Sequence, residues 1–287
     1  MITPLSELAL RSGGRPFPAG DLQMPADYGD PAVEYRAARS GAVVRDASHW
    51  ARLELAGPDH LDFLHRLTTG SFRDLSPGAG LRTVFPDNRG RIVTCGAFTR
   101  LDETRALGIL PPQGRVVLPA WLDRFHFSEA VSWIDRSAEL GMLELGGPMA
   151  AQVVAAVLGC DVAAAPEAAL LPASDTTGMH LLRYDHLGGA GLRLLGPPES
   201  LRDVWSRLLA AGACPLGEDV AEVLRIESGT PGPRELTTDH NPWEAGLGHL
   251  VHANKGCYIG QEVIARLSTY DKVKQRLVGV TLAPEGT

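Results

Sequence analysis

The stretch KGCYIGQE, residues 255–262, places a single cysteine two positions after a lysine and just ahead of a helical pattern. A cysteine reacts or binds a metal as the thiolate, and a nearby positive charge or a helix N-terminus lowers the thiol pKa. Lys255 is the candidate charge, and a helix expected from about Gln261 to Tyr270 is the candidate N-terminus. The pattern therefore indicates a reactive Cys257. The alternative is a small side chain that fills a gap in the core.

The neighbours of this cysteine also favour a ligand site. Gly256 and Gly260 allow the backbone to turn tightly and to approach a ligand closely. Glu262 stabilises the start of the helix but opposes a low thiol pKa, so the sign of the net shift stays open. From residue 255 to residue 276, five Lys or Arg face two Asp or Glu. This basic segment suits a polyglutamate tail or RNA phosphate, the alternative being a solvated basic surface.

Three similar units place a strand ahead of a helix. The segments LELAGP (53–58), LELGGP (143–148) and LRLLGP (192–197) each combine an alternating strand, a glycine turn and a proline near the first helical position. An amphipathic pattern follows each of them. Their spacings are unequal, which excludes a solenoid. The units indicate an α+β architecture.

Further strands and helices surround these units. A hairpin is expected from residues 81–98, where Gly90 supplies a positive φ and Asp87 caps the turn. Strands gathered in hairpins, with helices between them, favour antiparallel sheets with helices packed on one face. The other expected strands are 107–110, 130–134 and 179–184, and the other expected helices are 31–39, 116–125 and 219–227.

Composition and charge limit the class of protein. The 287 residues suffice for two subdomains, and a net charge of −7 makes the bulk surface repel nucleic acid and anionic membranes. The N-terminus lacks a basic segment followed by an apolar core, and no stretch reaches the ~20 apolar residues of a membrane span. Four scattered cysteines fit a reducing compartment better than a disulfide framework. We therefore expect a cytoplasmic protein that does not contact a membrane.

Three other patterns do not predict sites. His249 and His252 lack a fourth ligand beside Cys257, so no metal site is expected. The glycine-rich residues 186–191 lack the strand before and the helix after that a dinucleotide fingerprint requires. Residues 46–49, Asp-Ala-Ser-His, are interpreted as a turn at the entry to a strand.

Several segments together resemble the folate-binding family that includes the glycine-cleavage aminomethyltransferase (T-protein) and its YgfZ-type relatives. The octapeptide at 255–262 is similar to the one that sets the YgfZ type apart. The resemblance extends over roughly residues 31 to 280, and its other parts are residues 46–69, 85–92, 224–229 and 242–247.

The resemblance implies an α+β, GcvT-like folate-binding fold of antiparallel sheets with packed helices. We expect an arm at residues 1–29 and a first folate-binding subdomain at 30–135, with which the segment 216–272 can intertwine. The second subdomain is expected at 136–272 and carries the octapeptide. Residues 273–287 are expected to begin a C-terminal barrel that is otherwise missing.

The resemblance also implies a function. It suggests a tetrahydrofolate-binding factor that supports the assembly or maintenance of iron–sulfur proteins and is linked to tRNA modification. The expected cofactor is tetrahydrofolate or a one-carbon derivative, and the expected partners are iron–sulfur client or assembly proteins and, through residues 252–276, RNA. Cys257 is expected to act as a thiolate at the folate pocket. The residues assigned to the cofactor are Arg225, Glu244, Lys255, Gly256, Tyr258, Gln261 and Glu262.

Two departures separate the chain from aminomethyltransferases. The paired aspartates of that family are Thr94 and Cys95 here, and Gly189 stands where a glutamate reads the pterin. Glycine cleavage is therefore not expected, and whether the protein is an enzyme stays open. One alternative is a folate-dependent aminomethyl- or methyltransferase with a different acid, and another is a non-catalytic module that binds RNA or protein. Arg225 has its own alternative, an ion pair with Glu227.

Overall fold

A computed structural model describes residues 4–19, 22–162, 165–171, 178–187 and 191–280. Its strands are β1 (Arg15–Ala19), β2 (Leu22–Asp27), β3 (Val43–Asp46), β4 (Ala51–Ala56), β5 (Gly80–Pro86), β6 (Ile92–Arg100), β7 (Arg105–Leu110), β8 (Ser132–Asp135), β9 (Gly141–Gly146), β10 (Leu170–Leu171), β11 (His180–Arg183), β12 (Leu192–Gly196) and β13 (Cys214–Pro215). Its helices are α1 (Ser6–Arg11), α2 (Pro31–Ser40), α3 (His60–Leu67), α4 (Gly114–Phe125), α5 (Ala150–Leu158), α6 (Pro198–Ala210), α7 (Glu218–Glu227) and α8 (Gln261–Thr269), with a short 3-10 helix at Gly248–Leu250.

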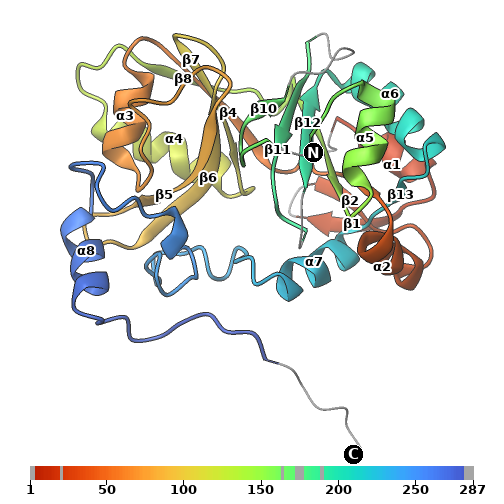
Figure 1. Cartoon of the computed structure of the whole chain (residues 1–287). Coiled ribbons are helices and arrows are strands. Elements are labelled where there is room, and N and C mark those ends of the chain that lie inside the picture. Colours follow the sequence, from red (N-terminus) through yellow and green to blue (C-terminus); the bar gives the residue numbers. More distant parts are fainter. Residues whose placement is uncertain (1–3, 20–21, 163–164, 172–177, 188–190, 281–287) are drawn as a thin grey trace, which may run out of the picture.

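Two large sheets form the body of the molecule (Figure 1). The first has five strands in the order β5-β6-β7-β4-β8, paired antiparallel. The second has six strands in the order β10-β11-β12-β9-β3-β13, in which β13 pairs with β3 in parallel and the other pairs are antiparallel. The predicted α+β class with antiparallel sheets is confirmed.

Local sequence signals explain where several elements begin and turn. The side chain of Asp30 accepts hydrogen bonds from the amides of Ala32 and Val33, and Pro31 occupies the first turn of α2. In the β5–β6 hairpin, Gly90 has a φ of +71° and the carboxylate of Asp87 accepts from two amides of the turn. The helix that begins at residue 31 and the hairpin turn at Asp87 and Gly90 were both predicted.

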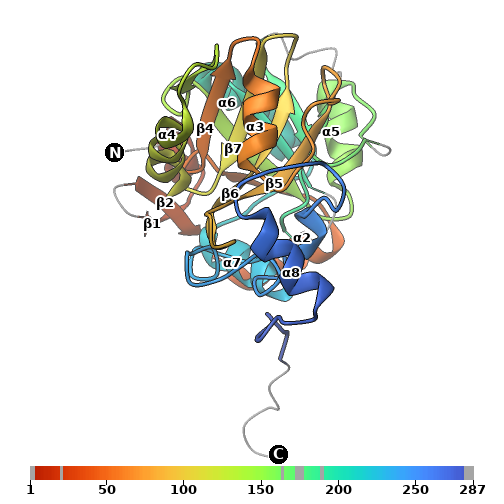
Figure 2. The ribbon, with the colours of Figure 1, turned by 90° about the vertical axis from the view of Figure 1, so that its left-hand side faces the viewer.

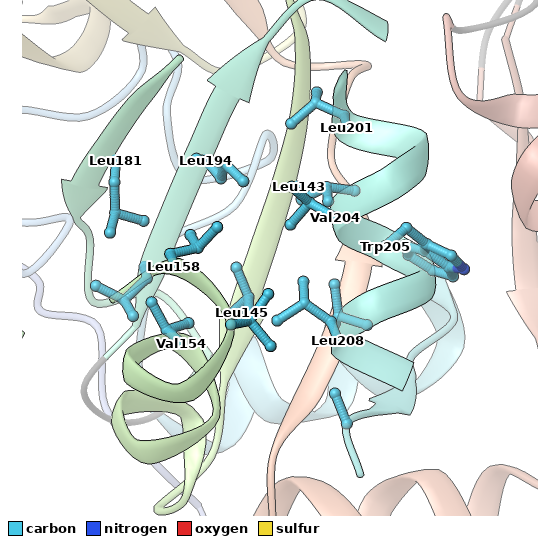
Figure 3. Packing of buried hydrophobic residues seen from close by; sticks show 14 of the residues in the cluster. Leu143, Leu145, Val154, Leu158, Leu181, Leu194, Leu201, Val204, Trp205 and Leu208 are labelled. Carbon is cyan, nitrogen blue, oxygen red and sulfur yellow. The ribbon is translucent and has the colours of Figure 1, made fainter. Parts of the chain in front are cut away.

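Alternation along the strands gives each sheet a helix-covered face and an inner face. In β9, Leu143 and Leu145 pack against Val204 and Leu208 of α6, with α5 beside them (Figure 3). The residues between and before them, including Glu144, point to the opposite face because successive side chains of a strand alternate. Helices α3 and α4 cover one face of the five-stranded sheet in the same way.

The inner faces of the two sheets pack against each other. Leu107 and Ile109 of β7 belong to one buried cluster with Met142 of β9, Leu182 of β11 and Leu195 of β12. The two sheets therefore form the central layers, with α3 and α4 outside one and α5 and α6 outside the other (Figure 1). Among the described residues, no helix has both the length and the apolar character needed to cross a membrane.

The described part of residues 1–29 does not form the expected arm but packs on the body of the molecule as a helix and two strands. Helix α1 packs on the six-stranded sheet, with Leu5 and Ala9 each 1% exposed, and β1 and β2 form a two-stranded sheet that contacts α7. Met24 is fully buried, and Arg15 pairs with the buried carboxylate of Asp27. These elements are too short to show a period in the sequence, and their burial depends on distant segments.

The chain after α7 crosses from one sheet to the other. It leaves α7 beside the six-stranded sheet, passes beneath the body of the molecule and reaches α8 beside the five-stranded sheet (Figures 1 and 2). The amide of Ile92 donates to the carbonyl of His240 at 2.9 Å, and the amide of His252 donates to that of Thr69 at 3.0 Å. The octapeptide therefore lies against the first sheet, although it was assigned to the second subdomain. The limits of the two subdomains stay a prediction.

Two glycines let α8 dock on the tip of the β5–β6 hairpin. Gly260, immediately before α8, has a φ of +76°, and a Cβ there would lie 2.2 Å from the carbonyl oxygen of Asp87. A Cβ at Gly90 would meet Ile264 and Val263 of α8 at 3.1 and 3.3 Å. The close approach of backbone to backbone thus requires glycine at position 260.

We expect Gly260→Ala to lower the free energy of unfolding by about 3 kcal/mol or more, because it combines an unfavourable φ with a clash against backbone. Gly229→Ala is the matched control, since Gly229 has a φ of +68° with no atom within 4 Å of the added Cβ. Its cost should be about 1 kcal/mol. Urea unfolding followed by circular dichroism measures both, and equal losses would contradict the tight docking of α8.

Candidate functional site

Three charged side chains form a row across adjacent strands of the six-stranded sheet. Glu144 of β9 lies directly opposite Arg45 of β3 and Arg193 of β12. One oxygen of its carboxylate accepts from Nε of Arg45 at 2.6 Å, and the other accepts from Nη2 of Arg193 at 2.9 Å. The three residues are 1%, 3% and 0% exposed, respectively. Two guanidinium groups thus share one buried carboxylate on the inner face.

A second carboxylate extends this ion triad of Arg45, Glu144 and Arg193. Arg45 also donates from Nη1 to Glu218, the first residue of α7, at 2.9 Å. Burial opposes ionisation of Glu144, but the charges of Arg45 and Arg193 outweigh it and hold the pKa of Glu144 below its usual value. Burial raises the pKa of Glu218 more than Arg45 lowers it. The two carboxylates therefore differ in how readily they bind a proton.

Aromatic rings enclose the guanidinium of Arg193. Its Cζ atom lies 4.0 Å from the ring centroid of Trp50 and 3.6 Å from that of Tyr184, which is cation–π geometry. His186 packs edge-on against Trp50 with 5.1 Å between ring centroids. Within the described part of the chain, Nη1 of Arg193 has no hydrogen-bond partner. The charged row thus orients the rings of Trp50 and Tyr184.

These groups border a cavity of about 150 Å³, here named the inter-sheet cavity. Burial lowers the pKa of His49 and of His186 to about 3, with nearby arginines adding to the effect, so both imidazoles are neutral. Nδ1 of His49 is buried and has no partner among the described residues. The cavity is lined by Arg45, His49, Trp50, Pro111, Pro112, His186, Glu218, Ala221, Glu222, Arg225, Pro231, Gly232, Pro233 and Leu236.

This lining suits a planar heterocycle with several hydrogen-bonding edges. A neutral imidazole offers one donor and one acceptor, and the carboxylates of Glu218 and Glu222 accept from N–H groups. The ring of Trp50 adds an aromatic surface. Perturbed pKa values concentrated around one cavity are typical of functional sites.

Cys257 lies elsewhere, on a larger cleft of about 870 Å³ that we name the Cys257 cleft. The thiol is exposed. Trp121, Arg124 and Phe125 from the end of α4 form one wall, the tip of the β5–β6 hairpin forms another, and residues 257–263 form a third. The guanidinium of Arg124 lies 5.6 and 5.8 Å from the ring centroids of Trp121 and Phe125, and no carboxylate pairs with it among the described residues. The cleft offers aromatic surface and a cation beside a thiol.

The inter-sheet cavity and the Cys257 cleft are neighbours. Leu236 lines the first and Thr238 lines the second. Two residues of chain span at most about 7 Å, so the linings of the two cavities approach each other at this segment. Helix α4 also connects them, because Pro111 and Pro112 precede its start and Trp121 lies near its end.

The structure divides the predicted cofactor residues. Tyr258, Gln261 and Glu262 line the Cys257 cleft, and Glu262 also forms an exposed pair with Arg266. Arg225 lines the inter-sheet cavity. It donates to the carboxylate of Glu222 and to the carbonyl of Thr230 and lies 3.9 Å from the carboxylate of Glu235, so the alternative pairing with Glu227 is wrong.

The other predicted cofactor residues line neither cavity. Glu244 accepts from Nη1 of Arg91 and from the amide of Asn241, both at 3.0 Å, which commits its carboxylate to the protein. Gly256 has a φ of +95°, and a Cβ added there would meet no atom within 4 Å, so it serves the local turn. Lys255 is 8% exposed and its ammonium donates to the carbonyls of His65, Thr68 and Gly70. The ammonium of Lys255 is therefore engaged with backbone carbonyls, and its effect on the thiol of Cys257 stays a prediction.

Strand β6 supplies no acid at the two positions where aminomethyltransferases carry aspartates. Thr94 and Cys95 lie there, and burial raises the pKa of the Cys95 thiol to about 11. Gly189, the other departure, lies outside the described residues. No group of three or more His, Cys, Asp or Glu in the described ranges could hold a metal ion.

The sequence reasoning missed the ion triad and the inter-sheet cavity. His49 was interpreted only as part of a turn. One signal was present, because two of the three repeated units carry opposite charges at the same position, Glu144 between two leucines and Arg193 between two others. A charge in the middle of an apolar strand needs a buried partner. These two units were predicted to be similar, but their strands were not predicted to be neighbours with Glu144 opposite Arg193.

The sequence is similar to those of known proteins. The sequence matches the family model described as the GCVT N-terminal domain over residues 5–255. It is 34% identical over 278 residues to an Arabidopsis thaliana protein named "Putative transferase At1g60990, chloroplastic", covering 95% of this chain and 63% of that protein. It is 30% identical over 297 residues to an aminomethyltransferase of Symbiobacterium thermophilum, covering 99% of this chain and 79% of that protein. The chain thus spans less than two thirds of the Arabidopsis protein.

A solved structure shows the same fold. The glycine cleavage system aminomethyltransferase T from Bartonella henselae is similar with a TM-score of 0.84, over 94% of this chain and 75% of that chain. The sequence identity is 22%, so this likeness shows the fold alone. The predicted GcvT-like fold is confirmed, whereas the YgfZ type stays a prediction.

We expect Glu144→Gln to lower the free energy of unfolding by about 3–5 kcal/mol, because it leaves two buried guanidinium groups without a counter-charge. The matched control is Glu139→Gln, whose carboxylate is 62% exposed and pairs with Arg136 at the surface. The control should change stability by less than about 1 kcal/mol. Urea unfolding at neutral pH measures both. A loss as small as that of the control would contradict a buried triad held together by charge.

The neutral state of His186 predicts a pH dependence. An unfolded histidine has a pKa of about 6.5, so between that pH and about 3 the unfolded chain binds a proton that the folded chain does not. The free energy of unfolding should therefore fall by about 1.4 kcal/mol per pH unit from this residue as the pH decreases. His186→Gln should reduce the slope by that amount, with His249→Gln at the surface as control. Urea unfolding at pH 6, 5.5 and 5 tests this, and an unchanged slope would show that His186 is protonated in the folded protein.

Proposed function

The chain belongs to the GCVT N-terminal domain family, and on that premise we propose that it binds tetrahydrofolate, or a one-carbon derivative, for folate-dependent one-carbon transfer. The relatives named as aminomethyltransferases support a transferase reading. The inter-sheet cavity is the site that we assign to the pterin ring. The observation that carries this assignment is a cavity lined by two neutral imidazoles, the carboxylates of Glu218 and Glu222 and the indole of Trp50.

The inter-sheet cavity is the smaller of the two sites. Its volume is about 150 Å³, against about 870 Å³ for the Cys257 cleft, so we assign to it the bicyclic ring and not the benzoyl-glutamate tail. A bound reduced folate would supply a one-carbon unit carried on nitrogen. The remainder of such a ligand would have to extend from the cavity past the prolines 231 and 233 that line it.

The side chains of the cavity have separate tasks in this proposal. The indole of Trp50 contacts one face of the ring, and the triad keeps the indole in place through Arg193. The neutral imidazole of His49 hydrogen-bonds an edge of the ring, since either ring nitrogen of a neutral histidine can donate or accept, depending on the tautomer. Glu218 and Glu222 accept from ring N–H groups, and Arg225 orients Glu222 through two hydrogen bonds, 2.7 and 2.6 Å long.

Cys257 is assigned to the acceptor side. Its exposed thiol stands in a cleft with room for a second substrate, and the lining of this cleft approaches that of the inter-sheet cavity at residues 236–238. Because β6 carries Thr94 and Cys95, we do not propose glycine cleavage. The role in iron–sulfur assembly and tRNA modification, the RNA contact through residues 252–276 and the cytoplasmic location stay predictions, since no observation on the described residues bears on them.

Thermal unfolding in the presence of tetrahydrofolate tests the proposal. A ligand that binds the folded state alone stabilises it by about 2.7 kcal/mol at 100 times its dissociation constant, so the wild-type melting temperature should rise. His49→Leu and Trp50→Leu should abolish the rise, because they remove the hydrogen-bonding edge and the aromatic face. Trp121→Leu and Cys257→Ser, in the Cys257 cleft, should keep it.

Two outcomes would contradict this assignment. A rise lost in the cleft variants and kept in the cavity variants would place the cofactor beside Cys257. No rise in the wild-type protein at saturating ligand would remove folate from the proposal and leave only the family and the fold. Circular dichroism of each variant without ligand establishes that it is folded before the comparison is made.

A further inference from the structure

The C-terminal end of helix α3 is completed by residues of the octapeptide. The last carbonyls of a helix have no partner within it and need donors from elsewhere. Here the hydroxyl of Thr68 donates to the carbonyl of Leu64 at 2.8 Å, and the ammonium of Lys255 donates to that of His65. The amide of Ile259 donates to the carbonyl of Arg66 at 3.1 Å. Two of these three donors come from residues on either side of Cys257.

Lys255 makes the larger contribution to this cap. Beyond His65, its Nζ atom donates to the carbonyls of Thr68 at 2.6 Å and Gly70 at 2.5 Å. The carbonyl of Lys255 in turn accepts a hydrogen bond from Nε2 of His65 at 2.8 Å. An ammonium has three donors that fan out from one atom, which matches three carbonyls gathered at a helix end better than the planar fork of an arginine would.

We propose that Lys255 is a positioning residue whose ammonium caps α3 and thereby holds Cys257 at the cleft. Lys255 and Ile259 both donate hydrogen bonds to carbonyls in the last turn of α3, and Cys257 is midway between them in the sequence. The thiol therefore stands at the centre of a five-residue loop with two anchored ends, on the outer side of the buried lysine. The capping does not depend on folate. Only the chemical role of Cys257 rests on the proposed function.

The surroundings of the ammonium are consistent with a cap rather than an ion pair. Burial, with a smaller effect from Arg73, lowers the pKa of Lys255 to about 7, while the three carbonyl acceptors favour the charged form. The groups that face it are His65, whose pKa burial lowers, the ring of Tyr258 with its centroid 4.9 Å away, and Arg73. No carboxylate pairs with Lys255 among the described residues, so backbone carbonyls are its acceptors.

Alkylation of thiols with iodoacetamide, read by mass spectrometry, tests the proposal together with amide hydrogen exchange. Lys255→Met should speed exchange of residues 252–259 by about tenfold or more, the change expected for one lost hydrogen bond from a charged donor. The same variant should change the alkylation rate of Cys257 and leave those of Cys95 and Cys214 unchanged. Lys255→Arg should restore part of the wild-type rate, which a general loss of stability would not predict.

Lys272→Met is the matched control, because it removes the charge of a lysine on the exposed basic segment. It should change neither the hydrogen exchange of residues 252–259 nor the alkylation rate of Cys257. If Lys255→Met does not fold, Lys255→Gln, which keeps two donors, is measured in the same way. A folded Met or Gln variant with wild-type exchange and wild-type Cys257 alkylation overturns the proposal. Failure of both to fold also overturns it, because Lys255 would then serve folding and not the position of the thiol. None of these readouts uses folate, so they are independent of the proposed cofactor.

Discussion

One buried carboxylate, that of Glu144, organises the centre of the molecule. It lies between Arg45 and Arg193 on three adjacent strands, and burying either cation without it would cost several kcal/mol. Once the charges are paired, the inner face of the six-stranded sheet can pack against the five-stranded sheet. The same pairing places Arg193 against Trp50 and fixes the ring that borders the inter-sheet cavity.

The site depends on this arrangement in two ways. The cations balance the charge of Glu144. Burial disfavours protonation of His49 and His186, and the nearby arginines add to this effect, so a cavity next to full charges is lined by neutral imidazoles. Helix α7 begins at Glu218, whose carboxylate lines the cavity and accepts a hydrogen bond from Nη1 of Arg45. The polar groups that would read a ring are thus oriented by the fold before any ligand arrives, which lowers the cost of binding. The thiol of Cys257 is oriented by a different device, the cap on α3.

Much of the fold could be predicted from short-range signals. The leucines of the repeated units, the start of the helix at residue 31 and the glycine of the hairpin turn each depend on signals within a few residues, and each was found where it was expected. The burial of α1 and β2 could not be predicted, because it depends on contacts with segments far along the chain. Glu144 shows the same limit within the site, since its two partners are 99 and 49 residues away. The octapeptide identified a loop that lines the Cys257 cleft, but the sequence could not tell that its lysine points into a helix end while its cysteine faces solvent.

The central claim is that the paired charges between the sheets build the binding place of a pterin. A crystal structure of the protein with a chemically stable reduced folate tests it most directly. The expected result is a bicyclic ring against Trp50, with a ring heteroatom within hydrogen-bond distance of the imidazole of His49. Density for the ring in the cleft beside Cys257, with the inter-sheet cavity free of ligand, would contradict it.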